Sequence, residues 1–203
     1  MSIMNEAEYK CPFCGKKFEY RTQRSYTTFG QFLDFKPYGA AKIPTPVPKC
    51  PKCNLVFFEE LFTKSDINKL KKKFVNNNIF QLEPYMPNYY YLAKEFELLD
   101  KEIDKIIYYY HSAIWENDGV FEKIANIIIQ YFERINDKDK NYYIYKLIKI
   151  DFLRRLKQFI PAIELIESLK NDTNFPNDNF GKLLDYQLKL IEEKNIREHK
   201  MPD

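Results

Sequence analysis

The sequence predicts a mainly α-helical protein with a small β zinc ribbon near its N-terminus. Composition is the first observation: 45% of the 203 residues are hydrophobic, 30% are charged and only 5 are glycine, which is typical of a globular chain rich in helices. The second is that all 4 cysteines stand in two C-x-x-C pairs. The third is a helical spacing of apolar residues from Asn88 onward. The predicted architecture is a four-cysteine, zinc-ribbon or rubredoxin-like module followed by an antiparallel helical array.

The two cysteine pairs are the strongest chemical signal in the chain. The first knuckle, residues 11–16, reads CPFCGK, and the second knuckle, residues 50–54, reads CPKCN. Two thiols two residues apart in a tight turn point at one metal ion. The residue after each second cysteine is expected at positive φ, which Gly15 adopts freely and Asn54 tolerates better than other non-glycine residues. The predicted ligands are Cys11, Cys14, Cys50 and Cys53.

Disulfides, free core thiols and a redox-active C-x-x-C are the alternatives to a metal. Two like pairs in a chain without secretory features favour a structural metal site, and a redox C-x-x-C normally occurs once, at a helix start. Zinc is predicted because it is available and commonly structural, while iron in a rubredoxin-like site uses the same ligands and is the less favoured occupant. Four protein sulfurs close the coordination sphere, which argues against catalysis at the ion.

The predicted N-terminal module covers residues 1–83. Residues 9–20 read as strand, knuckle and strand, and residues 55–58 as a short buried strand or an apolar lead into a helix. The insert of residues 21–49 carries four prolines and aromatic residues at every third position in its middle. We therefore expect an ordered excursion, either a short helix or a loop pinned by its aromatic side chains. Within it, residues 42–49 must be extended because prolines alternate there.

A basic helix ends this module. Ser65 is predicted as its N-cap and the asparagines at 76–78 as its C-terminal end. Pro84 and Pro87 then mark the boundary between the module and a helical domain of residues 84–203. The face of the basic helix expected to be buried consists of Ile67, Leu70 and Phe74.

The helical domain reads as about six amphipathic helices joined by short turns. One segment resembles the tetratricopeptide pattern, in which a small residue lets two helices pack closely. No clean 34-residue period accompanies it, so divergent repeats and a plain helical bundle both remain open. The residues of this segment are Leu153, Leu156, Phe159 and Ala162.

Charge is distributed unevenly although the formal net charge is only +3. Residues 1–73 contain 14 Lys and Arg against 7 Asp and Glu, and the rest of the chain contains 18 against 22. A basic front half hints at an anionic partner such as nucleic acid. The alternative is a solvated lysine face that also offsets the net charge of −2 on a Zn²⁺ with four thiolates. The candidate basic residues are Lys16, Lys17, Arg21, Arg24 and Lys69–Lys73.

No pattern of catalytic residues is present, so we expect that the protein is not an enzyme. His111 and His199 are the only histidines, the first expected within a helix and the second in the charged C-terminal segment. The sequence contains no phosphate-binding loop, nucleophile elbow or H-E-x-x-H motif. Residues 1–10 lack the features of a signal peptide and no apolar run approaches the length of a membrane span. Reduced, metal-binding cysteines suit the cytoplasm.

The knuckles and their flanks resemble a bacterial family known only as domain of unknown function 2225. In that family two such cysteine pairs precede a helical, tetratricopeptide-like region, and the resemblance covers residues 9–62. Asn54 departs from it, because the family tends to have glycine there. The resemblance implies a bacterial, cytoplasmic zinc protein without an assigned activity. The stretches that carry it are YKCPFCGKKF at residues 9–18, RS at 24–25 and CPKCNLVFFEELF at 50–62.

These observations predict a non-enzymatic adaptor. A structural zinc ribbon would be attached to helices whose surface is presented to a protein or peptide partner. The alternative prediction is a nucleic-acid-binding regulator that uses the basic zinc-ribbon half.

Overall fold

The computed structural model describes residues 3–25, 27–39, 44–77 and 85–202. In this part of the chain it is mainly helical, with two small antiparallel sheets, as predicted. The strands are β1 (Ile3–Lys10), β2 (Lys17–Ser25), β3 (Thr28–Gln31) and β4 (Pro37–Gly39). The helices are α1 (Lys64–Asn77), α2 (Asn88–Leu98), α3 (Ile103–Glu116), α4 (Phe121–Phe132), α5 (Tyr142–Arg155), α6 (Phe159–Lys170) and α7 (Asn177–Glu192), with short 3₁₀ turns at Glu59–Leu61 and Asp118–Val120. The six helices expected after Asn88 are all present.

The chain divides into two compact units. Unit 1 comprises residues 1–27 and 40–128, and unit 2 comprises residues 28–39 and 129–203. This division does not coincide with the predicted boundary between residues 83 and 84. The reason lies in long-range packing, because the insert and the helices after residue 84 share cores with segments distant in sequence.

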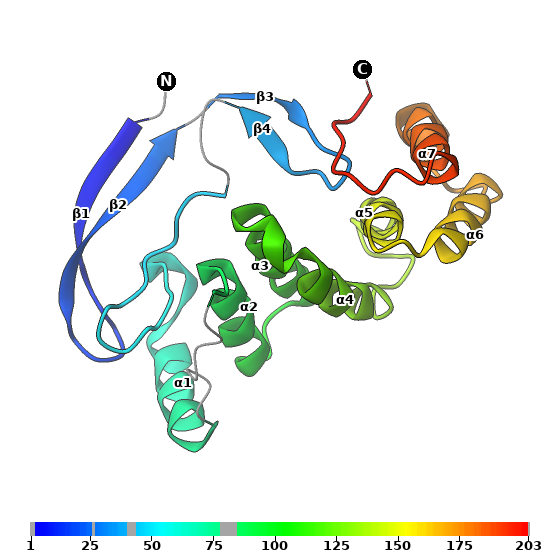
Figure 1. Cartoon of the computed structure of the whole chain (residues 1–203). Coiled ribbons are helices and arrows are strands. Elements are labelled where there is room, and N and C mark those ends of the chain that lie inside the picture. The colour runs from blue at the N-terminus through cyan, green and yellow to red at the C-terminus, as the bar shows by residue number, and fades with distance from the viewer. Residues whose placement is uncertain (1–2, 26, 40–43, 78–84, 203) are drawn as a thin grey trace. The chain divides into compact units, whose positions relative to one another are not determined.

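Unit 1 contains the ribbon of β1 and β2 and the first helices. The two strands are antiparallel neighbours in register from Met4 with Gln23 to Lys10 with Lys17, and the first knuckle connects them. Figure 1 shows this ribbon and shows α2 lying beside α3, the closest pair of helices in the unit. The strand–knuckle–strand prediction for residues 9–20 is therefore confirmed.

The start of α1 differs from the prediction. Thr63, rather than Ser65, caps the helix: its hydroxyl accepts a hydrogen bond from the backbone N–H of Asp66 at 3.1 Å. The carboxylate of Asp66 in turn accepts hydrogen bonds from the backbone N–H and the hydroxyl of Thr63, at 2.9 and 2.8 Å. This is a reciprocal capping box, which satisfies backbone donors that a helix start leaves free. Ile67 and Leu70 are buried as expected; the Phe74 side chain lies outside the described part of the structure.

The proline-rich segment before the second knuckle lies against α2. Residues 44–48 belong to no helix or strand, which agrees with the alternating prolines. Tyr89 donates a hydrogen bond from its hydroxyl to the carbonyl of Thr45 at 2.9 Å, and the Asn88 side-chain amide donates to the carbonyl of Val47 at 3.2 Å. The described residues of the proline-rich segment form no sheet, so their carbonyls need other partners. Tyr89 and Asn88 supply these donors. Residues 42–43 lie outside the described residues.

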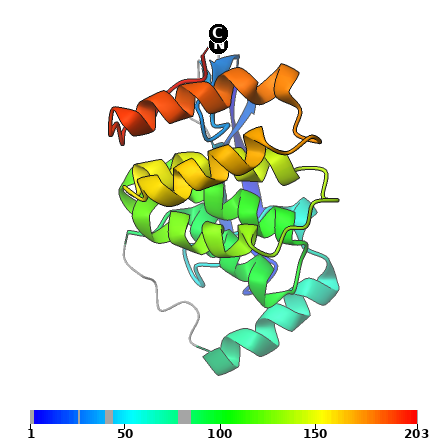
Figure 2. The ribbon, with the colours of Figure 1, turned by 90° about the vertical axis from the view of Figure 1, so that its right-hand side faces the viewer.

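Unit 2 combines residues 28–39 of the insert with the last three helices. Figure 2 shows α5, α6 and α7 stacked beside one another, and the buried side chains between them include Leu147, Ile150, Ile166 and Leu184. A short turn at residues 156–158 joins α5 to α6, with Ala162 fully buried after it. Close packing of a helix pair at a small residue is thus present.

The insert folds as a β-hairpin, β3 and β4, and not as the predicted short helix or loop. Leu33, at the tip, is fully buried in the core of unit 2. A Cβ at Gly30 would lie 2.7 Å from the Tyr38 hydroxyl oxygen, so a larger residue there would force the Tyr38 ring to move. The C-terminal segment pairs with the hairpin through hydrogen bonds from the Leu33 N–H to the His199 carbonyl, 2.8 Å, and from the Met201 N–H to the Gln31 carbonyl, 2.9 Å. The prediction of an ordered excursion is confirmed; its helical or loop form was wrong.

Candidate metal centre

The two knuckles have the same backbone hydrogen bonds. In the first, the Gly15 N–H donates to the Cys11 carbonyl and the Cys11 N–H donates to the Lys16 carbonyl, both at 2.9 Å. In the second, the Asn54 N–H donates to the Cys50 carbonyl and the Cys50 N–H donates to the Leu55 carbonyl, again at 2.9 Å. Each knuckle is therefore a closed turn that fixes the directions of its two cysteine side chains.

A left-handed residue completes each turn, as the sequence predicts. Gly15 has φ of 74° and Asn54 has φ of 60°. Glycine reaches this region without steric cost, and asparagine is the non-glycine residue found there most readily. The departure of Asn54 from glycine leaves the turn intact.

The four predicted ligands come together at one point. All four Sγ atoms lie within 4.8 Å of one another, with Cys11 and Cys53 at 3.5 Å and Cys14 and Cys50 at 3.5 Å. These separations are far longer than a disulfide bond of about 2.0 Å, and all four cysteines are free. Four sulfurs placed tetrahedrally about 2.3 Å from a zinc ion stand roughly 3.8 Å apart. The thiol cluster therefore fits a tetrahedral ion of this size.

The cluster belongs to the core of unit 1. The Cys11 and Cys50 side chains are buried and those of Cys14 and Cys53 are half-buried. Apolar side chains from the segment after the second knuckle and from α1 and α2 surround them, which excludes water from one side of the sulfurs. The buried apolar members of this cluster are Leu55, Phe57, Ile67, Leu70 and Leu99.

The thiols differ in acidity. Burial raises the pKa of the Cys11 thiol and of the Cys53 thiol above the ordinary range. At Cys14 slight burial also acts to raise the pKa, but hydrogen bonds from the Lys16 N–H and from the neighbouring thiols outweigh it and lower the pKa to about 7. Thiolate is the ligand form, so the Cys14 thiol is more ready to bind an ion at neutral pH than the Cys11 or Cys53 thiol.

A buried carboxylic acid forms a hydrogen bond with the chain just after the second knuckle, and the sequence pattern does not predict it. Glu95 of α2 is 1% exposed, and its Oε1 accepts a hydrogen bond from the Val56 N–H at 3.1 Å. Burial raises the pKa of Glu95 well above its usual range. In a helix, one glutamate among several gives no sequence signal that it will be buried against a segment 39 residues earlier.

The histidines do not form a catalytic group with the cysteines. His111 is buried in α3, with its ring centroid 4.6 Å from that of Trp115, as expected for a packed residue. His199 lies in the C-terminal segment, where its Nδ1 is 3.4 Å from the Tyr186 hydroxyl.

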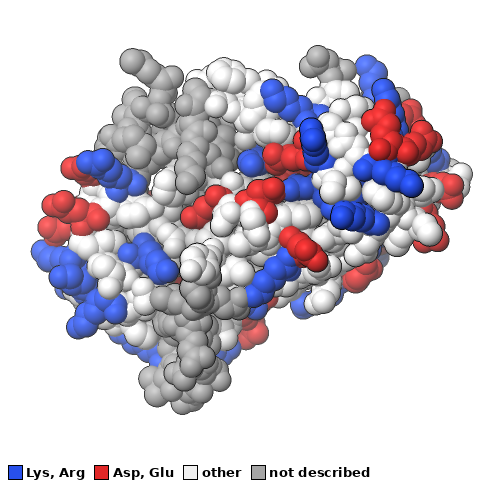
Figure 3. Space-filling model, in the orientation of Figure 1, with Lys and Arg blue, Asp and Glu red and all other residues white. Residues whose placement is uncertain are grey.

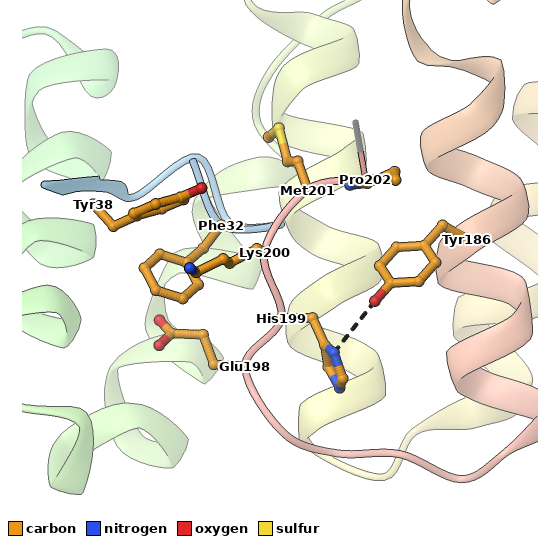
Figure 4. A pocket seen from close by; sticks show the side chains of 8 residues that line it. All are labelled: Phe32, Tyr38, Tyr186, Glu198, His199, Lys200, Met201 and Pro202. Atoms are coloured by element: carbon orange, nitrogen blue, oxygen red, sulfur yellow. Dashed lines mark hydrogen bonds between the residues drawn. The ribbon is translucent and has the colours of Figure 1, made fainter. Parts of the chain in front are cut away.

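His199 also lines a hollow of about 660 Å³ in unit 2. Figure 4 shows its side chains on both sides of the C-terminal segment. The Lys200 ammonium stands 4.1 Å from the centre of the Tyr38 ring, and the Glu198 carboxylate is 3.5 Å from the Lys36 ammonium. These two charged groups are therefore engaged by neighbouring side chains. Its lining consists of Phe32, Tyr38, Tyr186, Glu198, His199, Lys200, Met201 and Pro202.

Comparison with known proteins leaves the thiol cluster as the main guide to function. No family model, curated protein or solved structure matches the chain. Among the described residues, no helix is both long and apolar enough to cross a membrane.

Proposed function

We propose that the protein is a non-enzymatic zinc-binding adaptor in which the ion is structural. The observation that carries this proposal is the set of four thiols within 4.8 Å of one another. With all four tetrahedral positions filled by Cys11, Cys14, Cys50 and Cys53, no position remains for a water molecule or a substrate. Zinc is the proposed ion, and iron in the same four-sulfur site is the second choice.

The ion would hold unit 1 together. It would link the knuckles at residues 11–16 and 50–54, which contribute Cys11 and Cys50 to the same core as Leu70 and Leu99. Structural zinc contributes roughly 10–16 kcal/mol of apparent folding free energy in small modules. Loss of the ion would leave an empty space between four thiols, two of which are buried.

The proposed partner surface lies on the helices of unit 2. A groove of about 460 Å³ is lined by apolar side chains that include Leu153, Pro161 and Leu165 and by polar ones that include Lys149 and Glu164. Ile160, at the start of α6 beside Pro161, is 71% exposed. A lining that combines apolar and charged side chains suits an apolar anchor residue of a partner peptide.

The resemblance to the bacterial family of residues 9–62 and the tetratricopeptide-like helix pair α5–α6 are part of the same proposal. The helix pair has the short connection and the buried Ala162 that such units use. A cytoplasmic location is proposed because free cysteines that bind metal persist in a reducing compartment.

Crosslinking on the zinc-loaded protein tests the adaptor role. The zinc-loaded chain, a Leu165→Glu variant and an Ile196→Glu control are crosslinked in parallel, and captured proteins are compared by mass spectrometry. Ile196 is 40% exposed in unit 2 and does not line the groove, so the control adds the same charge elsewhere. The proposal requires a partner that the wild type and the control capture and Leu165→Glu loses. Equal capture by all three proteins would refute the groove as the docking surface.

Metal analysis tests the role of the ion itself. One zinc per chain, with four sulfur ligands by X-ray absorption spectroscopy, is expected. Nitrogen or oxygen in the first coordination sphere would contradict a closed structural site.

A further inference from the structure

Four lysines surround the two knuckles. Lys10 precedes the first knuckle, Lys16 is its last residue, and Lys52 stands inside the second knuckle, next to Cys53. The fourth is Lys71 of α1, whose ammonium lies 5.9 Å from the centre of the Phe13 ring in the first knuckle. The sulfur cluster brings the two knuckles together, so lysines from three separate segments border one small surface. We call Lys10, Lys16, Lys52, Lys71 and Phe13 the knuckle surface.

These lysines are exposed and lack acidic partners. In the described part of the chain, none of the four takes part in an ion pair. Other predicted basic residues are engaged: Lys17 pairs with Glu8 at 3.0 Å, and Arg21 pairs with Glu6 at 2.7 Å. Figure 3 shows Lys and Arg side chains gathered at the lower left, below a group of acidic side chains.

The other predicted basic residues are likewise either engaged by neighbouring groups or exposed. Lys73 lies 3.6 Å from the Asp100 carboxylate and donates to the Leu98 carbonyl, so it is not available to a ligand. Lys69 and Lys72 are exposed on α1, but residues one or two positions apart on a helix do not share a face, so neither is counted with Lys71. The Arg24 side chain lies outside the described part of the structure.

The register of the ribbon adds a second observation. Lys10 lies directly opposite Lys17 on the neighbouring strand, and like charges opposite each other destabilise a strand pair. Two pairs further along the ribbon, Glu8 lies opposite Glu19. The sign of the charge therefore changes along β1 and β2, and the positive end is the one that carries the first knuckle.

The thiolates of the metal site offset only part of this positive charge. Four thiolates around a Zn²⁺ ion carry a net charge of −2, whereas the knuckle surface carries four ammonium groups. A charge of +2 is left for an external anion. Cys11 and Cys50 are 1% and 0% exposed, so the burial of their sulfurs keeps part of the negative charge away from solvent.

We propose that the knuckle surface binds the phosphate backbone of a single-stranded nucleic acid. Ammonium groups spread over three segments match a chain of phosphates better than a single anion. Phe13, half-buried beside Lys71, offers a ring on which an unpaired base can stack. This inference does not depend on the protein partner proposed for unit 2; it depends on the ion that holds the knuckles.

Fluorescence anisotropy on the zinc-loaded chain tests the proposal, with labelled 20-nucleotide oligo(dT) and oligo(U), the corresponding duplex and a poly-glutamate competitor as probes. The test variant is Lys16→Glu, Lys52→Glu and Lys71→Glu together. The matched control changes Lys138, Lys140 and Lys182 to Glu; these lysines are exposed in unit 2. Zinc content is measured for every protein, and a triple change to Gln serves if the Glu variant loses its ion.

Four phosphate contacts predict a slope of about −2.8 for log affinity against log salt on a single strand, or roughly a 50-fold loss between 50 and 200 mM salt. The Glu or Gln variant should lose most of the affinity and of the slope with its zinc retained, and Phe13→Leu should weaken binding about fivefold or more with the slope unchanged. Several results would overturn the proposal: no binding at 50 mM salt, an equal loss in the control, tighter binding of the duplex, or displacement by poly-glutamate at matched charge.

Discussion

Glu95→Gln should make the protein more stable at neutral pH and change the pH dependence of its stability. In the native protein the Glu95 carboxyl is 1% exposed, and one oxygen accepts the Val56 N–H. The other oxygen has no hydrogen-bond partner among the described residues. Burial raises the pKa of this carboxyl well above its usual range, so between the unfolded-state and folded-state pKa values the folded protein keeps a proton that the unfolded chain has released. Glutamine keeps the acceptor for Val56 and removes the titration.

The sign and size of the effect follow from proton linkage. A group with a raised folded-state pKa contributes stability below its unfolded pKa, about 4.3 for glutamate, and that contribution is lost as pH rises toward the folded value. Within this window each pH unit lowers the free energy of unfolding by about 1.4 kcal/mol. The difference in free energy of unfolding between Glu95→Gln and the wild type should therefore grow by about 1.4 kcal/mol for each pH unit above about pH 4.3. It should reach a plateau at the folded pKa of Glu95.

Urea unfolding at half-unit steps from pH 4.5 to 8, with zinc-loaded wild type and variant side by side, measures this difference. Protonation of the cysteines affects both proteins equally and cancels in the comparison. Glu122→Gln, at an exposed position on α4, is the matched control and should show no such growth. A constant difference between Glu95→Gln and wild type across the series would refute the assignment of a protonated Glu95.

Three further changes test other parts of the structure. Cys50→Ser, or removal of zinc by a chelator, should abolish cooperative unfolding of unit 1 seen by near-UV circular dichroism; an unchanged signal would contradict a structural ion. Thr63→Ala should cost about 1 kcal/mol in urea unfolding and Ser65→Ala much less, because Thr63 is the observed cap; the reverse order would restore the prediction from sequence. Arg154→Met should cost about 3–5 kcal/mol by the same assay, because Arg154 is fully buried and its loss leaves the buried Asp151 carboxylate with only the longer, 3.7 Å pair to Arg155; a cost below 1 kcal/mol would show that the pair is dispensable.

The knuckles were predictable because their determinants are local. A C-x-x-C turn needs only its own residues and a left-handed position after the second cysteine, so Gly15 and Asn54 could be assigned from sequence. The six helices after Asn88 were also predictable, since each carries its own apolar stripe. The cap of α1 was misassigned because Thr63 and Ser65 are both good caps, and the choice rests on the reciprocal bond with Asp66.

Long-range features were not predictable in this way. The burial of Glu95 depends on the segment that follows the second knuckle, and the hairpin fold of the insert depends on helices more than 100 residues later. Aromatic residues at every third position suggested a helix or a loop. In the structure, the Tyr38 side chain packs over Gly30, and Leu33 lies in a core formed by residues distant in sequence. Periodicity in one segment carries no information about which core will accept it.

The long insert between the knuckles can be understood from the cost of closing a loop. The connection of residues 15–49 is 35 residues long, yet the entropy of loop closure grows only by about 0.6 kcal/mol for each doubling of length. A single extra buried side chain such as Leu33 stabilises by about 1.5–3 kcal/mol. The length of the insert therefore costs the metal site little, and burial of Leu33 in the core of unit 2 is large enough to offset this loop-closure cost. The core of unit 2 contains no cysteine. We therefore expect its packing not to depend on the ion.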